Sequence, residues 1–318
     1  MNRNFIMEKS TIKKFLKDYQ LNLLQFNPVS AGVENESAFV DTNNGRFVLR
    51  VYNKSKSRKE INLELAFMDF LSNTMPIPRI LRNSKGLLLS TKNINGITRN
   101  FIIMGRIEGS HLYSSQLNLI SEISKYQALM HKAAIKFKRN YKKPADTIIQ
   151  DIIFFRNELK NAKKILSKDP VGTNCLILAK ALIKEMEVNL DELMSLPAGL
   201  VHRDYDSDNI IVKDKVTGII DFDDLSHRPF VSDLAGSLWW WLYGNRGRAS
   251  EIFKKYVAGY EKYRKPTIKE KAWMPLFMRA RNIAIGILLN ANRKRKLDYL
   301  ELKNALAFDK LVANLQGA

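Results

Sequence analysis

Residues 200–224 read LVHRDYDSDNIIVKDKVTGIIDFDD, and this stretch carries the strongest structural signal in the chain. Two short apolar runs within it, 210–212 and 218–220, are separated by polar residues, so we expect them to pair as an antiparallel hairpin. Asn209 precedes the first run and Asp221 follows the second. Antiparallel pairing would bring these two side chains to the same edge of the hairpin.

Acidic residues gather in and just after this stretch, although the chain as a whole is strongly basic. The 318 residues include 52 Lys and Arg against 32 Asp and Glu, a formal net charge of +20. The gathered acids are Asp204, Asp206, Asp208, Asp214, Asp221, Asp223, Asp224 and Asp233. Like charges held close together destabilise a fold unless a cation binds among them. Their oxygen ligands favour a hard divalent cation, which indicates Mg²⁺.

The spacing of the polar residues adds a family resemblance. His202, Asp204 and Asn209, followed by Asp221 within Ile-Asp-Phe, resemble the catalytic loop and metal motif of kinase-like phosphotransferases. More narrowly, the chain is similar to the superfamily of aminoglycoside phosphotransferases, choline kinases and homoserine kinases. In that group Ile-Asp-Phe stands where protein kinases have Asp-Phe-Gly, and an Asp-Leu-Ala commonly follows, here at 233–235.

The resemblance implies an ATP- and Mg²⁺-dependent phosphotransferase that acts on a hydroxyl of a small molecule. Asp204 would act as general base or orient the acceptor hydroxyl, and Asn209 and Asp221 would bind Mg²⁺. His202 would brace the catalytic loop by hydrogen bonding, and Asp233 would brace it as well. The implied nucleotide-binding residues are Gly32 and Asn35 in a phosphate loop, Arg50 in place of a phosphate-binding lysine, its partner Glu64, and Met104 and Arg106 in a hinge that meets adenine.

The resemblance also implies an α+β, two-lobed protein-kinase-like fold. Residues 1–106 would form a nucleotide-binding lobe with an antiparallel sheet and one helix, and residues 107–318 a mostly helical lobe with the catalytic loop and substrate site. Residue patterns predict strands at 37–40, 46–52, 86–90 and 99–104 and a helix at 57–72. Further helices are predicted at 114–137, 148–167, 175–196, 232–243, 248–262, 268–290 and 297–316.

Acidic residues beside the catalytic loop favour an acceptor that carries an amine: a homoserine-like amino alcohol, choline or an aminoglycoside. Homoserine is preferred because Leu49-Arg50 and the chain length resemble that branch. The residues that would hold such a substrate are Asp206, Asp208, Asp223 and Asp224, although a second metal shell or the loop itself would use them equally well. The run Trp239-Trp240-Trp241 fits a cation–π cage for a quaternary amine less well than core packing, since helical spacing keeps the three off one face.

Other patterns narrow the class of protein. A single cysteine, Cys175 in an apolar run, excludes an intramolecular disulfide framework and fits a buried thiol in a reducing cytosol. No signal peptide is seen, and no apolar run reaches the roughly 18–20 residues of a membrane span, so we expect a cytoplasmic protein without a membrane partner. His131 follows an apolar helical stretch and is expected to pack on a helix face.

Two rival functions remain. A Ser/Thr protein kinase would carry an Ala-Pro-Glu element after the metal motif, and none is present. A non-catalytic pseudokinase or basic nucleic-acid-binding module would not need Asp204, Asn209 and Asp221 together, and the basic residues are scattered without interleaved aromatic residues. The sequence predicts no oligomeric state.

Overall fold

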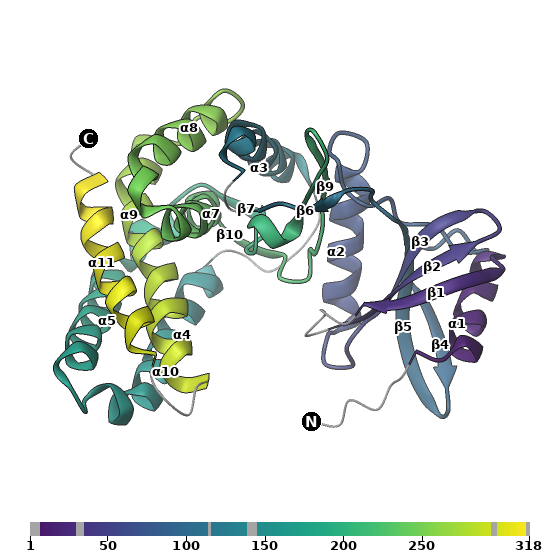
Figure 1. The fold of residues 1–318 in the computed structure, drawn as a ribbon, viewed down its shortest axis with the longest axis horizontal. Coiled ribbons are helices and arrows are strands. Elements are labelled where there is room, and N and C mark those ends of the chain that lie inside the picture. Colours follow the sequence, from purple (N-terminus) through teal and green to yellow (C-terminus); the bar gives the residue numbers. More distant parts are fainter. Residues whose placement is uncertain (1–6, 30–34, 114–115, 139–144, 294–297, 316–318) are drawn as a thin grey trace. The chain divides into compact units, whose positions relative to one another are not determined.

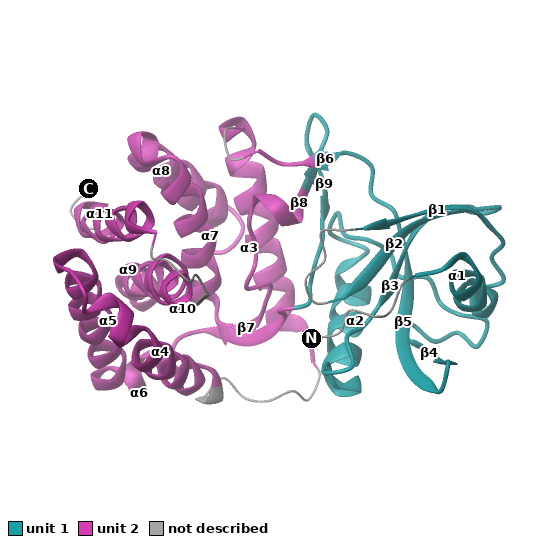
Figure 2. Cartoon of the chain, turned by 60° about the horizontal axis from the view of Figure 1, so that its bottom comes forward, with its two compact units in different colours: residues 1–110, 211–223 teal, residues 111–210, 224–318 magenta. Residues whose placement is uncertain are grey.

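The computed structural model describes residues 7–29, 35–113, 116–138, 145–293 and 298–315. The chain forms two compact units, one made of residues 1–110 and 211–223 and the other of residues 111–210 and 224–318 (Figure 2). An antiparallel sheet dominates the first unit and helices dominate the second, in agreement with the predicted α+β, kinase-like fold.

The first unit contains a five-stranded antiparallel sheet in the order β1-β2-β3-β5-β4. Its elements are α1 (Lys9–Leu16), η1 (Lys17–Tyr19), β1 (Leu23–Val29), β2 (Glu36–Thr42), β3 (Gly45–Val51), α2 (Arg58–Leu71), β4 (Ser90–Ile94), β5 (Ile97–Gly105) and β9 (Val216–Ile219).

Helices α1 and α2 cover opposite faces of this sheet (Figure 1). Side chains alternate between the two faces along a strand. In β3, Leu49 and Val51 therefore pack with α1, whereas Val48, together with Tyr52 directly after the strand, packs with α2. Arg50 shares the parity of the second pair, so the strand directs it to the α2 face. A capping box in which Ser57 and Glu60 bond each other's backbone N–H fixes the start of α2.

The strands predicted at 37–40 and 46–52 are confirmed as β2 and β3, with Thr42 paired to Gly45 across the turn between them. The strand predicted at 86–90 is wrong, because only Ser90 belongs to β4. Asn95 and Gly96, at φ 51° and 80°, form the turn between β4 and β5. A two-residue Asn-Gly turn with positive φ at both positions sets the register of a hairpin, so the strand lies directly before this turn.

The second unit consists mainly of helices, with a two-stranded antiparallel sheet of β7 and β10. Its elements are η2 (Leu117–Leu119), α3 (Ile120–Lys136), α4 (Ala145–Leu166), α5 (Pro170–Val188), α6 (Leu190–Met194), β7 (Ala198–Val201), η3 (Ser207–Asn209), β10 (Ser226–Pro229), α7 (Phe230–Gly244), η4 (Arg246–Arg248), α8 (Ala249–Glu261), α9 (Ile268–Asn282), the π-helix η5 (Ile283–Leu289), α10 (Asn290–Arg293) and α11 (Tyr299–Leu315).

The predicted helices of this unit are present, with shifted ends. The helix predicted at 175–196 is split into α5 and α6, and the one predicted at 268–290 continues from α9 through the π-helix into α10. The chain passes between the units within β6 (Ser110–His111) and β8 (Ile210–Val212), which join β9 in a sheet of order β6-β8-β9.

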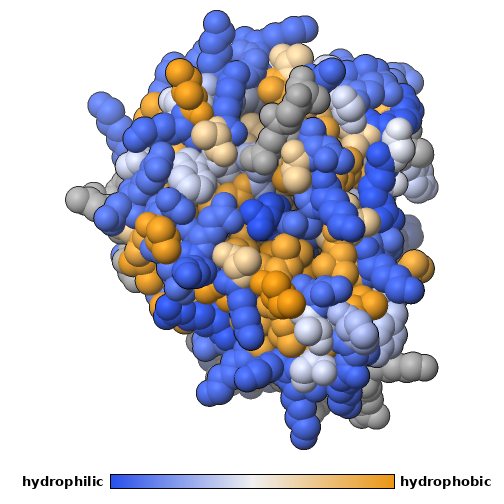
Figure 3. All heavy atoms as spheres, turned by 90° about the vertical axis from the view of Figure 1, so that its left-hand side faces the viewer, coloured by the Kyte–Doolittle hydropathy of each residue, from blue (hydrophilic) through white to orange (hydrophobic). Residues whose placement is uncertain are grey.

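The core of the second unit takes up most of the residues that the sequence marked as buried. Trp239, Trp241 and Cys175 are each at most 3% exposed, so core packing is confirmed for two of the three tryptophans and for the thiol. The third, Trp240, is half-buried and donates from Nε1 to Ser207 Oγ at 2.9 Å. Hydrophilic side chains cover most of the face of this unit that Figure 3 shows, with smaller apolar areas between them. Among the described residues, no helix is both long and apolar enough to cross a bilayer.

Candidate active site

Asp204 lies in the loop between β7 and η3, and hydrogen bonds from two directions hold its carboxylate. Asn209 donates from Nδ2 to Asp204 Oδ2 at 3.1 Å and to the Asp204 carbonyl oxygen at 2.9 Å. Arg281, on α9, donates from Nη2 to Asp204 Oδ1 at 2.9 Å. The structure therefore brings together the predicted base Asp204 and the predicted metal ligand Asn209. Because the amide nitrogen faces Asp204, Oδ1 of Asn209 is the atom left to face a cation.

A buried aspartate holds this loop in place by hydrogen bonding to its backbone. Asp233, on α7, accepts from the Arg203 backbone N–H at 2.6 Å, from His131 Nε2 at 3.0 Å and from Gln127 Nε2 at 2.8 Å. His131 also contacts the Tyr260 hydroxyl at 2.6 Å. These hydrogen bonds agree with the expected bracing role of Asp233 and with the expected packed position of His131, which is 0% exposed.

The protonation states of this brace follow from burial and hydrogen bonding. Burial alone would raise the pKa of Asp233, but the hydrogen bonds from His131 and Gln127 bring it below its ordinary value. Burial also lowers the pKa of His131, which favours the neutral ring at pH 7. An ionised Asp233 beside a neutral histidine therefore holds the loop by hydrogen bonds.

Two residues of the predicted motifs have a left-handed backbone. Arg203 has φ 68° and Asp221 has φ 64°, a region that L-residues other than glycine, asparagine and aspartate rarely adopt. Such a conformation costs on the order of 1 kcal/mol and persists where the surroundings impose it. At Arg203 the hydrogen bond from the backbone N–H to Asp233 is the visible constraint.

In the first unit, three carboxylates meet two cations, a group called the carboxylate cluster below. Arg50 Nη1 lies 3.1 Å from Asp223 Oδ1, 3.5 Å from Asp221 Oδ1 and 3.9 Å from Glu64 Oε1. Lys56 Nζ lies 2.6 Å from Glu64 Oε2 and 3.2 Å from Asp223 Oδ1. Arg50 and Glu64 were predicted to belong together, and the structure adds Asp223 and Lys56 to them.

Sequence reasoning missed Lys56. It stands in the run Lys54-Ser55-Lys56-Ser57-Arg58-Lys59, which is typical of a solvated helix end. The structure instead places its ammonium group between Glu64 and Asp223, and its side chain is 16% exposed. What distinguishes Lys56 from the other lysines of the run is its contact with Glu64, eight residues later in the chain. No local sequence pattern predicts such a contact.

Burial and neighbouring charges shift the pKa values of two carboxylates of the cluster in opposite directions. Burial raises the pKa of Asp223, but Arg50 and Lys56 reverse this and bring it below its ordinary value. Burial raises the pKa of Glu64 and exceeds the opposing effect of Lys56. The Tyr52 hydroxyl donates to Glu64 Oε1 at 2.9 Å. Three carboxylates against two cations leave a site suited to additional positive charge.

This donor set fits a divalent cation that is bound mainly by a nucleotide. Among the described residues, no group of three or more Asp, Glu, His or Cys side chains is arranged to hold a metal ion by itself. Mg²⁺ commonly takes only one or two protein ligands and completes its octahedron with water and phosphate oxygens. Asp221 within the first unit is an oxygen donor of that kind, and so, separately, is Asn209 within the second; their role as metal ligands stays a prediction.

The remaining nucleotide-binding predictions have mixed outcomes. Gly32 lies outside the described residues. Asn35 is buried, donates to Asp223 and accepts from the Asn53 N–H at 2.9 Å, so it supports the carboxylate cluster. Met104 is buried in β5, and the Arg106 N–H donates to the Arg46 carbonyl oxygen at 3.2 Å while its guanidinium stacks on Phe39. No contact tests the predicted adenine hinge.

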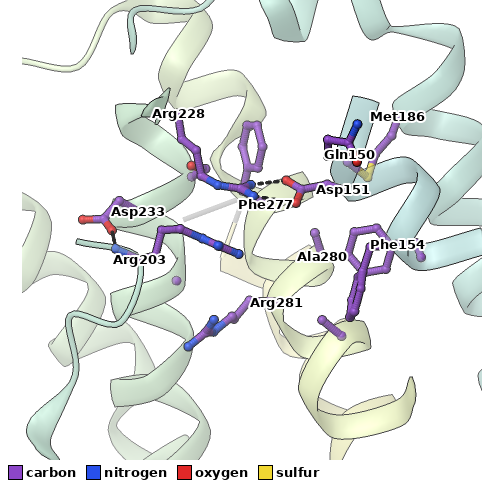
Figure 4. A pocket seen from close by; sticks show the side chains of 14 residues that line it. Gln150, Asp151, Phe154, Met186, Arg203, Arg228, Asp233, Phe277, Ala280 and Arg281 are labelled. Carbon is purple, nitrogen blue, oxygen red and sulfur yellow. Dashed lines mark hydrogen bonds and ion pairs between the residues drawn. The ribbon is translucent and has the colours of Figure 1, made fainter. Parts of the chain in front are cut away.

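A cavity of about 330 Å³ opens beside the catalytic loop within the second unit. Arg203, Arg228 and Arg281 line it, and we call it the arginine pocket (Figure 4). The other lining residues are Gln150, Asp151, Phe154, Phe155, Met186, Ser232, Asp233, Gly236, Phe277, Ala280 and Ala284. Its volume is at the small end of the range for ligand pockets. No local sequence pattern predicts this pocket, because its arginines come from a loop, β10 and α9.

None of the four aspartates proposed to hold the substrate lines the arginine pocket. Asp206 caps η3 by accepting from the Asp208 N–H at 2.9 Å, and burial raises its pKa to about 7. Asp208 and Asp224 are exposed, and Asp223 belongs to the carboxylate cluster. The acidic lining inferred from the sequence is therefore not found at this pocket.

Comparison with known proteins gives a consistent picture. Residues 25–266 match the model of a family described as the phosphotransferase enzyme family. The chain is 26% identical over 278 residues to a homoserine kinase of Sinorhizobium medicae, which covers 84% of this chain and 79% of that protein. It is 24% identical over 332 residues to a homoserine kinase of Beijerinckia indica, covering 98% and 96%. A solved amicoumacin kinase, in complex with AMP-PNP, Ca²⁺ and Ami, superposes with a TM-score of 0.70 at 17% identity and covers 97% of this chain and 94% of its own.

Proposed function

Because the chain belongs to the phosphotransferase enzyme family and is a small-molecule kinase, we propose that it transfers the γ-phosphate of ATP to a hydroxyl of a small, amine-bearing molecule with the help of Mg²⁺. The observation that carries this proposal is the catalytic loop, in which Asn209 and Arg281 hold the Asp204 carboxylate beside a ligand-sized cavity. A general base or orienting group must be held in this way if it is to align a hydroxyl for attack.

The reaction exchanges one phosphorus–oxygen bond for another. The acceptor hydroxyl oxygen forms a bond to the γ-phosphorus, the bond to the β–γ bridging oxygen breaks, and ADP leaves with that oxygen. Asp204 orients the hydroxyl and accepts its proton as the new bond forms. Asn209 and Asp221 would hold Mg²⁺, which supplies neutralisation of the phosphate charge when it is bound. Arg50 would contact phosphate oxygens, with Glu64 fixing its position.

Among acceptors we favour a homoserine-like amino alcohol over choline and aminoglycosides. The two homoserine kinases described above, which match at least 79% of their own length, support this order. Their identity to the chain is low enough that the acceptor itself has to be measured. A protein substrate is not favoured, since the matching proteins act on small molecules by their names.

The test is ADP release with ATP and Mg²⁺ across L-homoserine, choline, an aminoglycoside and a generic protein substrate. We expect turnover with one small-molecule class that disappears in Asp204→Asn. Turnover of the protein substrate alone, or turnover that survives Asp204→Asn, would contradict the proposal. A parallel titration that replaces Mg²⁺ with Ca²⁺ or Mn²⁺ would establish which divalent ion the activity requires.

A further inference from the structure

The three arginines of the arginine pocket differ in how they are paired. Arg228 makes two hydrogen bonds to the Asp151 carboxylate on α4, one of them from Nη2 to Oδ1 at 2.8 Å. Arg281 makes one to Asp204 at 2.9 Å. The Arg203 side chain makes no hydrogen bond or ion pair with any residue in the described part of the chain, and Figure 4 shows it extending into the pocket between Arg228 and Arg281.

Hydrogen-bond donors exceed acceptors around this cavity. Besides the guanidinium of Arg203, the buried Nε–H groups of Arg228 and Arg281 find no acceptor among the residues that the structure describes. Asp233 also lines the pocket, but its oxygens already accept from the loop and from α3. Arg203 is exposed, so water can reach it, but a guanidinium with five donors and no acceptor beside two further guanidinium groups favours an anion as its partner.

The position of Arg203 strengthens this argument. Its backbone is left-handed at φ 68°, where glycine would be free of strain, so a long side chain stands where the backbone favours none. Partial desolvation, and after it the nearby charge of Arg228, lowers the pKa of Arg203, although the residue as a whole is exposed and Asp151 and Asp224 oppose the shift. An anion placed among the three guanidinium groups would offset both the desolvation of Arg203 and the repulsion between Arg203 and Arg228.

We propose that the arginine pocket binds an anionic group of the phosphate acceptor, with Arg203 as its main partner, so that the acceptor is a hydroxyl-bearing carboxylic acid such as a hydroxy amino acid. This inference rests on the proposed function and narrows it. Arg228 is fixed by Asp151, and Arg281 links the pocket to Asp204. An acceptor held by its carboxylate here would therefore contact Arg281, which also holds the Asp204 carboxylate. Choline and aminoglycosides carry no carboxylate and would leave Arg203 without a partner.

Three acceptors separate the contribution of each charged group. L-homoserine carries a hydroxyl, an amine and a carboxylate; 3-aminopropan-1-ol lacks the carboxylate, and 4-hydroxybutyrate lacks the amine. We expect the wild-type kcat/KM for 3-aminopropan-1-ol to be on the order of 100-fold below that for L-homoserine, as hydrogen bonds to charged groups warrant. Equal turnover of these two acceptors would overturn the inference while leaving the proposed function in place.

Arg203→Gly is the informative variant, because glycine accepts the left-handed backbone and keeps the N–H that Asp233 binds. We expect kcat/KM for L-homoserine to fall about 10- to 100-fold, mainly through KM, with little change for 3-aminopropan-1-ol. Arg203→Lys should recover part of the loss. An equal loss with both acceptors would mean that Arg203 only shapes the loop, and would overturn the inference. Arg156→Gln, on the exposed side of α4, removes the same charge away from the pocket and serves as the control.

Calorimetric titration without nucleotide keeps the inference independent of turnover. L-homoserine and 4-hydroxybutyrate should bind the wild-type protein at least 10-fold more tightly than 3-aminopropan-1-ol, and this preference should vanish in Arg203→Gly. Absence of the preference would overturn the anion site. Binding with the expected preference, but without ADP release from any acceptor, would uphold the anion site and instead contradict the proposed function.

Discussion

The carboxylate cluster of the first unit and the arginine pocket of the second have opposite charge balances. In the cluster, Glu64, Asp221 and Asp223 share two cations, and every cation touches at least two carboxylates. In the pocket, Asp151 pairs with Arg228 and Asp204 pairs with Arg281. Arg203 pairs with no carboxylate among the described residues. The first region has one carboxylate more than it has cations, whereas in the second the side chain left without an ion-pair partner among the described residues is a cation, Arg203. The difference suggests that a cation completes the first and an anion completes the second.

The largest effect is expected from Asp204→Asn, which removes the carboxylate proposed to act on the acceptor hydroxyl and keeps the shape of the side chain. The variant should lose about 10³-fold in kcat, because an amide accepts no proton, while nucleotide affinity stays within about twofold. Acceptor-dependent ADP release and a separate nucleotide titration measure the two quantities. A parallel fall in nucleotide affinity would show that Asp204 belongs functionally to the nucleotide site rather than to the acceptor side.

Asp223→Asn tests whether the carboxylate cluster is a structural unit. Asp223 is largely buried and accepts from Arg50, Lys56 and Asn35, so its loss should lower the free energy of unfolding by about 2–3 kcal/mol at pH 7. Urea unfolding measures this change. The neighbouring Asp224→Asn is the matched control, since Asp224 is exposed and should shift stability by less than about 0.5 kcal/mol. Equal effects of the two variants would remove Asp223 from the cluster.

Asp221→Asn should behave in the opposite way within the same cluster. Asparagine tolerates a left-handed backbone, and the nearest cation lies 3.5 Å away, so stability should change by less than about 1 kcal/mol. The affinity for Mg²⁺ with nucleotide should fall at least about tenfold, because the ligand loses its charge. An unchanged Mg²⁺ titration of activity would exclude Asp221 as a metal ligand.

Lys56→Met asks whether the second cation of the cluster is needed. Removing it leaves the buried Glu64 with Tyr52 and the more distant Arg50, and the free energy of unfolding should fall by about 1–2 kcal/mol. Lys54→Met, two residues earlier and exposed, is the control and should be nearly neutral. If both variants unfold at the same urea concentration, Lys56 is a solvated lysine, as its sequence context suggests.

The smallest effect concerns Glu36, a carboxylate of the first unit that lies outside the cluster. Burial raises its pKa to about 7 although Arg99 opposes this. A raised carboxylate pKa stabilises the fold below the unfolded pKa of about 4.5, and this contribution is lost as the pH rises through about 7. Glu36→Gln should therefore exceed the wild type in stability at pH 8 by up to about 1 kcal/mol and match it at pH 4.5. Equal stability at pH 8 would show that Arg99 compensates the charge.

The fold and the reaction class could be predicted from the sequence because their signals are local. The spacing of Asp204, Asn209 and Asp221 is short, and the helices of the second unit have regular apolar periods. The arginine pocket could not be predicted in this way, since its residues are distributed from position 150 to 284 and meet only after α4, β10 and α9 have packed. The same holds for Lys56, whose partners are Glu64 and Asp223. Charge counted along the sequence indicated an acidic substrate site, which stays a prediction, whereas the cavity beside Asp204 is lined by three arginines.

The left-handed backbone at Arg203 has a consequence for how this protein responds to random mutation. A glycine there releases local strain. The free energy of unfolding of Arg203→Gly should therefore exceed that of Arg203→Ala by about 1 kcal/mol, the cost of such a conformation, and its melting temperature should be higher. A screen that rewards thermal stability alone would thus favour glycine, which lacks the side chain that the proposed acceptor site needs. At this position, therefore, arginine lowers stability relative to glycine but provides the guanidinium proposed to recognise the acceptor.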